Sequence, residues 1–231
     1  MTQKLVLFDI DGTIMTGGGS GKRAMDRALL EIFGTAGSSN SYSFGGKTDR
    51  QIVLDLIGKT GVPAETILEK MGVVFDLYIE ALKEEVLLDA RRRLLPGVRE
   101  LLGLLYERGD AVLGLLTGNI ERGAKIKLTS FELHSYFVVG AYGDDAISRN
   151  DLPEIAVERA RRLTNKLFQE KNIVIIGDTP LDIECGLKVN AKSIAVATGT
   201  FSPAQLKPYQ PDYLFENLEK SEEVLNAIFD S

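Results

Sequence analysis

The stretch KLVLFDIDGT, residues 4–13, decides how this 231-residue chain folds. Lys4 is followed by four successive apolar residues, so a strand here is apolar on both of its faces. Such strands belong to parallel sheets that are covered by helices on both sides. Asp9 and Asp11 follow the apolar run at once, and Gly12 permits a tight turn behind them. The stretch therefore predicts a buried strand that ends in an acidic turn.

Other apolar runs of the same character predict the remaining strands, at residues 110–118, 136–141, 172–178 and 192–198. Helical patterns alternate with these runs, at about 97–108, 121–131, 151–168 and 180–189. Strands and helices in regular alternation are typical of βαβ units. The predicted fold class is therefore α/β, with a doubly wound, Rossmann-like parallel sheet.

One interval breaks this alternation. No strong strand candidate lies between about residues 15 and 93, where helical patterns occur near 20–33, 49–59 and 63–92. We therefore predict an α/β core domain of residues 1–16 and 94–231, and an all-helical cap domain of residues 17–93 inserted after the first strand. Ligands of open α/β sheets bind beyond the carboxyl ends of the strands, so a cap that leaves from such an end would lie over the site as a lid.

Composition limits the possible partners. The formal net charge is -6, which argues against a nucleic acid as partner because such proteins need a basic face. The single cysteine, Cys185, forms no internal disulfide, and no apolar run approaches the roughly 18 residues that span a bilayer. We find no signal-peptide pattern. We expect a cytoplasmic protein with a small anionic substrate, no membrane partner, and a monomeric or homodimeric state.

Polar residues follow three of the predicted strands. They form the segments Asp9–Thr13, Thr117–Asn119 and Asp178–Asp182. In a parallel sheet these ends share one edge, so several carboxylates meet there and repel one another. Mg²⁺ relieves such repulsion and completes its coordination shell with waters and substrate phosphate oxygens. Single aspartates after strands more often cap helices, but three matching segments favour a site.

These segments resemble the haloacid dehalogenase (HAD) superfamily, and within it the phosphatases similar to phosphoglycolate phosphatase. The matching stretches are LFDIDGT (7–13), LLTGN (115–119) and IIGDTPLDIECG (175–186), in the order of the family. The resemblance covers nearly the whole chain, and the helical insert resembles the family's cap. It implies a Mg²⁺-dependent phosphomonoester hydrolase that acts through an aspartyl-phosphate on a small phosphorylated metabolite, with 2-phosphoglycolate as the leading candidate.

The resemblance also implies roles for individual residues. Asp9 would be the nucleophile, and Asp11 the general acid for the leaving group and then the base for water. The expected phosphate-binding residues are Gly12, Thr117, Gly118, Asn119 and Arg149. The expected metal site consists of Asp9, Asp11 through its carbonyl, Asp178, and Asp182 directly or through water.

Arg149 stands where the chain departs from the family pattern. The family has a lysine, often in K-P-x-P, before the helix that precedes the fourth strand, but the stretch here is AISRNDLPEIAVERA (146–160). Arginine is always charged and offers a forked set of donors to phosphate. We expect Arg149 to supply the cation, with a register that places Asn150 at the family position as the alternative.

Two segments of the insert are notable. The glycines at 17–19 and 21 precede Lys22, but a P-loop would need glycine at Thr16 and a hydroxyl residue at Arg23, so a hinge is the better interpretation. In SFGGKTDRQI (43–52), the resemblance suggests that Gly46, Lys47 and Thr48 face the site and read the substrate. The alternative is that Thr48 or Asp49 only caps the next helix.

Other functions stay open from sequence. A sugar phosphomutase of the same superfamily keeps both aspartates and is the hardest alternative to exclude. A non-catalytic phosphate-binding or signalling protein, similar to a receiver domain, also has an acidic pocket on an α/β core. Receiver domains are about half this length and lack a helical insert.

Overall fold

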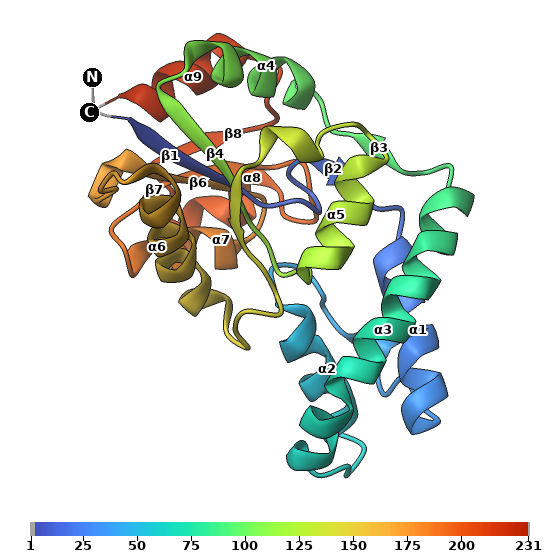
Figure 1. The fold of residues 1–231 in the computed structure, drawn as a ribbon. Coiled ribbons are helices and arrows are strands. Elements are labelled where there is room, and N and C mark those ends of the chain that lie inside the picture. Colours follow the sequence, from blue (N-terminus) through green and yellow to red (C-terminus); the bar gives the residue numbers. More distant parts are fainter. Residues whose placement is uncertain (1–2, 231) are drawn as a thin grey trace.

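The computed structural model of the protein describes residues 3–230 (Figure 1). Six of its described strands form a sheet of order β5-β4-β1-β6-β7-β8, in which all neighbours are parallel. The strands are β1 (Lys4–Phe8), β4 (Ala111–Leu116), β5 (Val139–Ala141), β6 (Ile173–Gly177), β7 (Lys192–Val196) and β8 (Tyr213–Phe215). The order runs outward from β1 in both directions, which confirms the predicted doubly wound α/β fold.

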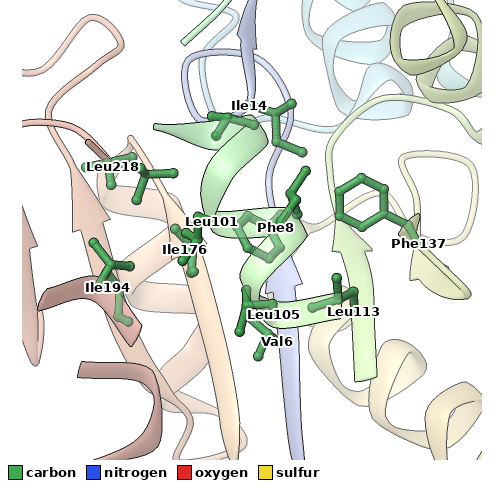
Figure 2. Packing of buried hydrophobic residues seen from close by; sticks show 14 of the residues in the cluster. Val6, Phe8, Ile14, Leu101, Leu105, Leu113, Phe137, Ile176, Ile194 and Leu218 are labelled. Carbon is green, nitrogen blue, oxygen red and sulfur yellow. The ribbon is translucent and has the colours of Figure 1, made fainter. Parts of the chain in front are cut away.

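The strand that opens the sequence is the centre of this sheet. Val6 and Phe8 face one side, where they pack with Leu101, Leu105 and Phe137 (Figure 2). The alternate residues of β1 face the other side and pack into a second cluster. Every residue of β1 is buried, and the four apolar residues after Lys4 have the uninterrupted apolar character that a covered sheet requires.

Helices cover both faces of the sheet. The cluster around Phe8 includes apolar residues of α4 (Val98–Arg108), α5 (Glu121–Thr129) and α9 (Ser221–Phe229). The opposite cluster includes residues of α6 (Leu152–Thr164) and α7 (Pro180–Leu187). The short helix α8 (Pro203–Leu206) packs Leu206 against β7. None of the helices among residues 3–230 is long and apolar enough to cross a membrane.

The inserted segment forms three helices beside the sheet. They are α1 (Ser20–Phe33), α2 (Asp49–Gly58) and α3 (Ala64–Leu88), at the lower right of Figure 1. Their apolar faces make a hydrophobic cluster of their own, to which Ile120 at the start of α5 also belongs. The domain boundaries at 16/17 and 93/94 stay a prediction.

Several elements differ from the predicted ones. Met15–Thr16 (β2) pairs antiparallel with Arg93–Leu94 (β3), so the expectation of no strand between 15 and 93 is wrong at both margins. Two-residue strands have no periodicity to detect. The predicted strand at 136–141 begins only at Val139, because a 3₁₀ turn occupies His134–Tyr136. The elements β8, α8 and α9 were not predicted.

Candidate active site

Three aspartates meet at the carboxyl edge of the sheet. Asp9 follows β1, Asp178 follows β6, and Asp182 lies in the first turn of α7. One carboxylate oxygen from each lies within 4.8 Å of the others, and all three residues are buried. Such a group of hard oxygen donors can hold a metal ion.

The turn after β1 holds Asp178 in place. The Thr13 hydroxyl donates to Asp178 Oδ1 over 3.3 Å. Gly12 has a φ of 90°, and a Cβ there would overlap the Asp178 carboxylate, so only glycine fits. The N–H of Gly12 donates to the carbonyl of Met15 over 2.8 Å. The Gly12 N–H is therefore already used within the chain, and the expectation that Gly12 binds phosphate gains no support from a free backbone donor.

Arg149 is buried in contact with Asp9, the candidate nucleophile. It opens the 3₁₀ turn Arg149–Asp151, and its side chain is only 2% exposed. Its Nη2 is 3.2 Å from Asp9 Oδ1 and also pairs with Asp182 Oδ1. Asn150 is exposed instead. The structure thus places Arg149, and not its neighbour, among the carboxylates.

Both carboxylate oxygens of Asp182 already accept hydrogen bonds. Its Oδ1 accepts from Arg149, and its Oδ2 accepts from the Thr179 N–H at 2.9 Å and from the Thr179 hydroxyl at 2.6 Å. This pairing is a capping box at the start of α7. Asp182 is therefore better placed to hold Arg149 than to coordinate a metal directly.

The electrostatics of this group favour a bound cation. Burial raises the pKa of Asp9 to about 6, an effect that Arg149 opposes and Asp182 and Asp11 strengthen. Burial, with Asp182 and Asp9 nearby, also raises the pKa of Asp178 well above its usual range. Both shifts reflect first the cost of burying a carboxylate and then the repulsion between neighbouring carboxylates, and a divalent ion would offset both.

Asp11 has a different environment, with 41% of its side chain exposed. Its Oδ2 accepts from Asn119 Nδ2 at 2.9 Å and from Lys127 Nζ at 2.5 Å. Lys127 also donates to Asn119 Oδ1 at 2.6 Å. Asp11 Oδ1 has no hydrogen-bond partner among residues 3–230 and lies on the side of Gly17, at the cavity. One carboxylate oxygen is thus held and the other is free.

The three residues after β4, Thr117–Asn119, have different roles. Thr117 is fully buried, does not line the cavity, and accepts from Asn119 Nδ2 at 2.8 Å. Gly118 lines the cavity, and its N–H has no acceptor within the described part of the chain. A Cβ on Gly118 would overlap the carbonyl of Lys47. Of these three residues, Gly118 offers a free donor, while Thr117 orients Asn119.

A cavity of about 540 Å³ separates these groups from the inserted helices. Gly46 and Lys47 line it, as expected, but Thr48 does not. The Thr48 hydroxyl accepts from the Gln51 N–H at 3.1 Å and donates to the Ile147 carbonyl at 2.5 Å. Thr48 therefore caps α2, which was the alternative interpretation.

Lys47 is one of two lysines of the insert, with Lys22, that line this cavity. Its Nζ lies 3.9 Å from the centre of the Tyr42 ring and 3.5 Å from Asp55 Oδ2. The long ion-pair distance leaves the ammonium of Lys47 able to contact a second anion.

Asp49, two residues after Lys47, is buried and accepts from the Ile120 N–H at 2.9 Å. Burial raises the pKa of Asp49 to about 7.

The glycine run lines one wall of the cavity. Gly18 and Gly19 have positive φ, and α1 begins after them. Arg23 donates to the Gly18 carbonyl at 3.0 Å and to Asp89 Oδ2 at 2.6 Å, so it ties the two connections of the insert together. The run is a connection and not a P-loop, and its role as a hinge stays a prediction.

Comparison with known proteins decides the family. The profile of the haloacid dehalogenase-like hydrolases matches residues 6–196. This chain belongs to that family. Pyrophosphatase PpaX of Listeria welshimeri is 26% identical over 231 residues, covering 94% of this chain and 95% of the relative.

Solved structures of the same fold agree with this membership. A predicted phosphatase from Clostridium acetobutylicum superposes with a TM-score of 0.72 at 22% identity, covering 98% of this chain and 100% of its own. A predicted phosphoglycolate phosphatase from Haemophilus somnus gives a TM-score of 0.70 at 18% identity, covering 97% and 99%. At these identities the likeness concerns the fold.

Within this hydrolase, sequence reasoning missed Lys127 and considered Asp49 only as a helix cap. Lys127 is 3% exposed although it lies on a helix whose sequence, ERGAKIKLT, is mostly polar. A signal was present, because Lys127 shares a helix face with Ala124 and Leu128, both of which are buried. A lysine on an apolar face is expected to have an anionic partner.

Proposed function

We propose that this HAD-family hydrolase is a Mg²⁺-dependent phosphomonoesterase that forms a phosphoryl intermediate on Asp9. One observation carries the proposal. Asp9 is buried against Arg149 beside Asp178, while Asp11, two residues on, keeps one carboxylate oxygen free at the cavity. A nucleophile and an acid with such different environments suit the two ends of a phosphoester bond.

The residues present fit a magnesium ion. Asp9 and Asp178 offer carboxylate oxygens, and the main-chain carbonyl of Asp11 is a further candidate ligand. Asp182 would act through Arg149 or a water, because both of its oxygens are engaged. When bound, Mg²⁺ offsets the carboxylate charge and polarises the phosphoryl group.

The chain's own residues account for the transfer. A carboxylate oxygen of Asp9 attacks phosphorus, and the bond between phosphorus and the ester oxygen breaks. Asp11 gives a proton to the departing oxygen, then takes one from the water that attacks the aspartyl-phosphate. Free phosphate leaves and Asp9 is restored. Lys127 and Asn119 keep the Asp11 carboxylate in one orientation throughout.

Donors for the phosphoryl oxygens lie around Asp9. The Gly118 N–H has no acceptor among residues 3–230, and Arg149 supplies positive charge, which is the type of preorganised stabilisation that developing charge requires. Asn119 is not counted among these donors, because its amide donates to Asp11.

The limited size of the cavity supports a small substrate, and 2-phosphoglycolate remains the leading candidate. Cytoplasmic location, a monomeric or homodimeric state, and the absence of nucleic-acid and membrane partners remain expectations.

Phosphate release tests the proposal. The protein with Mg²⁺ should release phosphate from 2-phosphoglycolate or from an aryl phosphate, and Asp9→Asn should abolish this because the amide is a poor nucleophile. Asp110→Asn, before β4 and so at the opposite edge of the sheet, is the matched control and should keep full activity. Full activity of Asp9→Asn would refute the mechanism. Conversion of glucose 1-phosphate to glucose 6-phosphate without phosphate release would refute the hydrolase in favour of the mutase.

A further inference from the structure

The hydroxyl of the buried residue Tyr78 has no hydrogen-bond partner in the described part of the chain. The residue lies in α3, is 1% exposed, and lines the cavity. Among residues 3–230, no group forms a hydrogen bond with its hydroxyl. Buried tyrosine hydroxyls usually find a hydrogen-bond partner, so one that faces a cavity indicates that a ligand supplies it.

Lys127 adds a second donor at the same place. Its ammonium carries three N–H bonds, and its protein acceptors are Asp11 Oδ2 and Asn119 Oδ1. One donor is therefore left over. The side chain is almost completely buried, so this donor depends on the cavity for an acceptor.

Gly21 shows that the two donors border one space. A Cβ on Gly21 would lie 3.4 Å from Lys127 Nζ and 3.7 Å from the Tyr78 hydroxyl oxygen. The absence of a side chain at position 21 leaves that space open. Met25, Phe44 and Ile52 line other parts of the same cavity and offer no competing polar group.

The position of this space determines what it meets. It adjoins Asp11, to which the proposed function assigns protonation of the leaving group, because Lys127 Nζ contacts Asp11 Oδ2. An ammonium and a hydroxyl, both donating, suit a group that only accepts hydrogen bonds. The acidic side chains nearby are Asp11, held by Lys127 and Asn119, and Asp49, whose Oδ2 is used by Ile120.

We propose that Lys127 and Tyr78 form a leaving-group subsite that selects substrates with a second anionic group, a carboxylate or a phosphate, close to the scissile oxygen. This inference rests on the proposed function, because it assigns the leaving group to the Asp11 side. Lys127 thereby has two tasks: it positions Asp11 and it binds the second anion. Tyr78 has only the second task.

Matched substrates test the subsite. The compounds 2-phosphoglycolate and 2-hydroxyethyl phosphate differ only in a carboxylate against a neutral hydroxymethyl group. We expect the wild-type protein to prefer the carboxylate by at least about 10-fold in kcat/KM, which is the effect of one hydrogen bond to a charged group. Pyrophosphate, compared with an aryl phosphate, is the second arm and shows whether phosphate replaces the carboxylate.

The variants separate the two residues. Tyr78→Phe should lower the preference for the anionic substrate about 3- to 10-fold, mainly through KM. Lys127→Gln keeps a donor near Asp11 but loses the charge, so it should lower kcat on both substrates and also reduce the preference. Lys127→Arg, which keeps the charge, should restore the preference in part. Tyr136→Phe, packed against Tyr106 away from the cavity, is the control and should change neither.

The outcomes distinguish the two proposals. If the wild-type protein hydrolyses both substrates and Tyr78→Phe and Lys127→Gln leave the preference unchanged, the subsite is refuted and the phosphatase stands. A purely structural role of Lys127 would lower kcat without altering the preference, which also refutes the subsite. If no phosphoester is hydrolysed, the proposed function fails and the subsite fails with it.

Discussion

The floor and the roof of the cavity are built on different principles. The floor consists of Asp9, Asp178, Asp182 and Arg149, which come from the sheet edge, and each of these side chains has a protein partner. The roof includes Lys22, Phe44, Lys47 and Tyr78, which come from the helices and loops of the insert. There the Tyr78 hydroxyl has no partner among the described residues, and Lys47 has a distant one.

This difference indicates that the floor serves catalysis and the roof serves substrate selection. A floor whose charged side chains are held by ion pairs and hydrogen bonds cannot rearrange at low cost, which suits chemistry that depends on fixed charges. A roof that includes a hydroxyl without a partner and a weakly paired lysine can gain contacts from a ligand, which suits selection. Changes to the floor should therefore affect all substrates alike, whereas changes to the roof should affect some substrates more than others.

Removal of divalent metal should have the largest effect. Chelation with EDTA should abolish phosphate release, and added Mg²⁺ should restore it. Mg²⁺ should also raise the thermal midpoint of the wild-type protein, because it relieves the repulsion between Asp9 and Asp178. Asp178→Asn should lose most of this rise. Full activity in EDTA would contradict the floor as described.

Substitution of Arg149 should be nearly as severe. Arg149→Met leaves Asp9 and Asp182 buried without their cation, which should cost about 3–5 kcal/mol of unfolding free energy and lower kcat on every substrate alike. Urea unfolding and phosphate release measure the two effects. Arg149→Lys keeps the charge but not the fork, so it should fall between Met and wild type. A loss confined to one substrate would place Arg149 in substrate selection instead.

Lys47→Met should have a smaller and selective effect. We expect KM to rise about 10-fold for substrates with a second anion and kcat to change little, because Lys47 lies on the roof. Lys59→Met removes another lysine near the Tyr42 ring, outside the cavity lining, and serves as control. An equal loss on neutral and anionic substrates would break the distinction between floor and roof.

Asp49→Asn should change how the free energy of unfolding depends on pH. Burial raises the pKa of Asp49 to about 7, so between roughly pH 4 and 7 the folded protein keeps a proton that the unfolded chain has lost. The stability from this group is therefore complete below pH 4 and is lost as the pH rises through 7, by at most about 1.4 kcal/mol per pH unit. Asp49→Asn should gain stability relative to wild type over that range in urea unfolding.

The exposed Asp76→Asn, which has an ion pair with Arg122, is the matched control for this measurement. It should follow the wild-type profile. A difference between Asp49→Asn and wild type that does not vary between pH 5 and 8 would mean that Asp49 is ionised throughout.

Much of the site could be predicted because it depends on local patterns. Strand periodicity located β1, β4 and β6, and parallel strands bring their carboxyl ends to one edge. Asp9 and Asp178 followed from that rule, and the structure brings them together. Thr48 and Gly12 were assigned to ligands, but the structure uses the Thr48 hydroxyl and the Gly12 N–H internally. A motif does not state which donors the backbone has already used.

The sequence did not single out Lys127, because its partner lies far away along the chain. It contacts Asp11 across a separation of 116 residues, and no local pattern couples those two positions. Tyr78 resembled an ordinary core residue of α3, because helical spacing cannot distinguish a packed ring from one whose hydroxyl reaches a cavity.

The sequence by itself determined the covered parallel sheet, the acidic edge and the helical insertion, since burial on both faces and residue order follow from local composition. Only the tertiary structure decided which charges are paired. Arg149 meets Asp9 and Asp182, and Lys127 meets Asp11, because the strand ends and helices converge in space. The physical reason is that electrostatic and hydrogen-bond energies depend on distance through space, not along the chain.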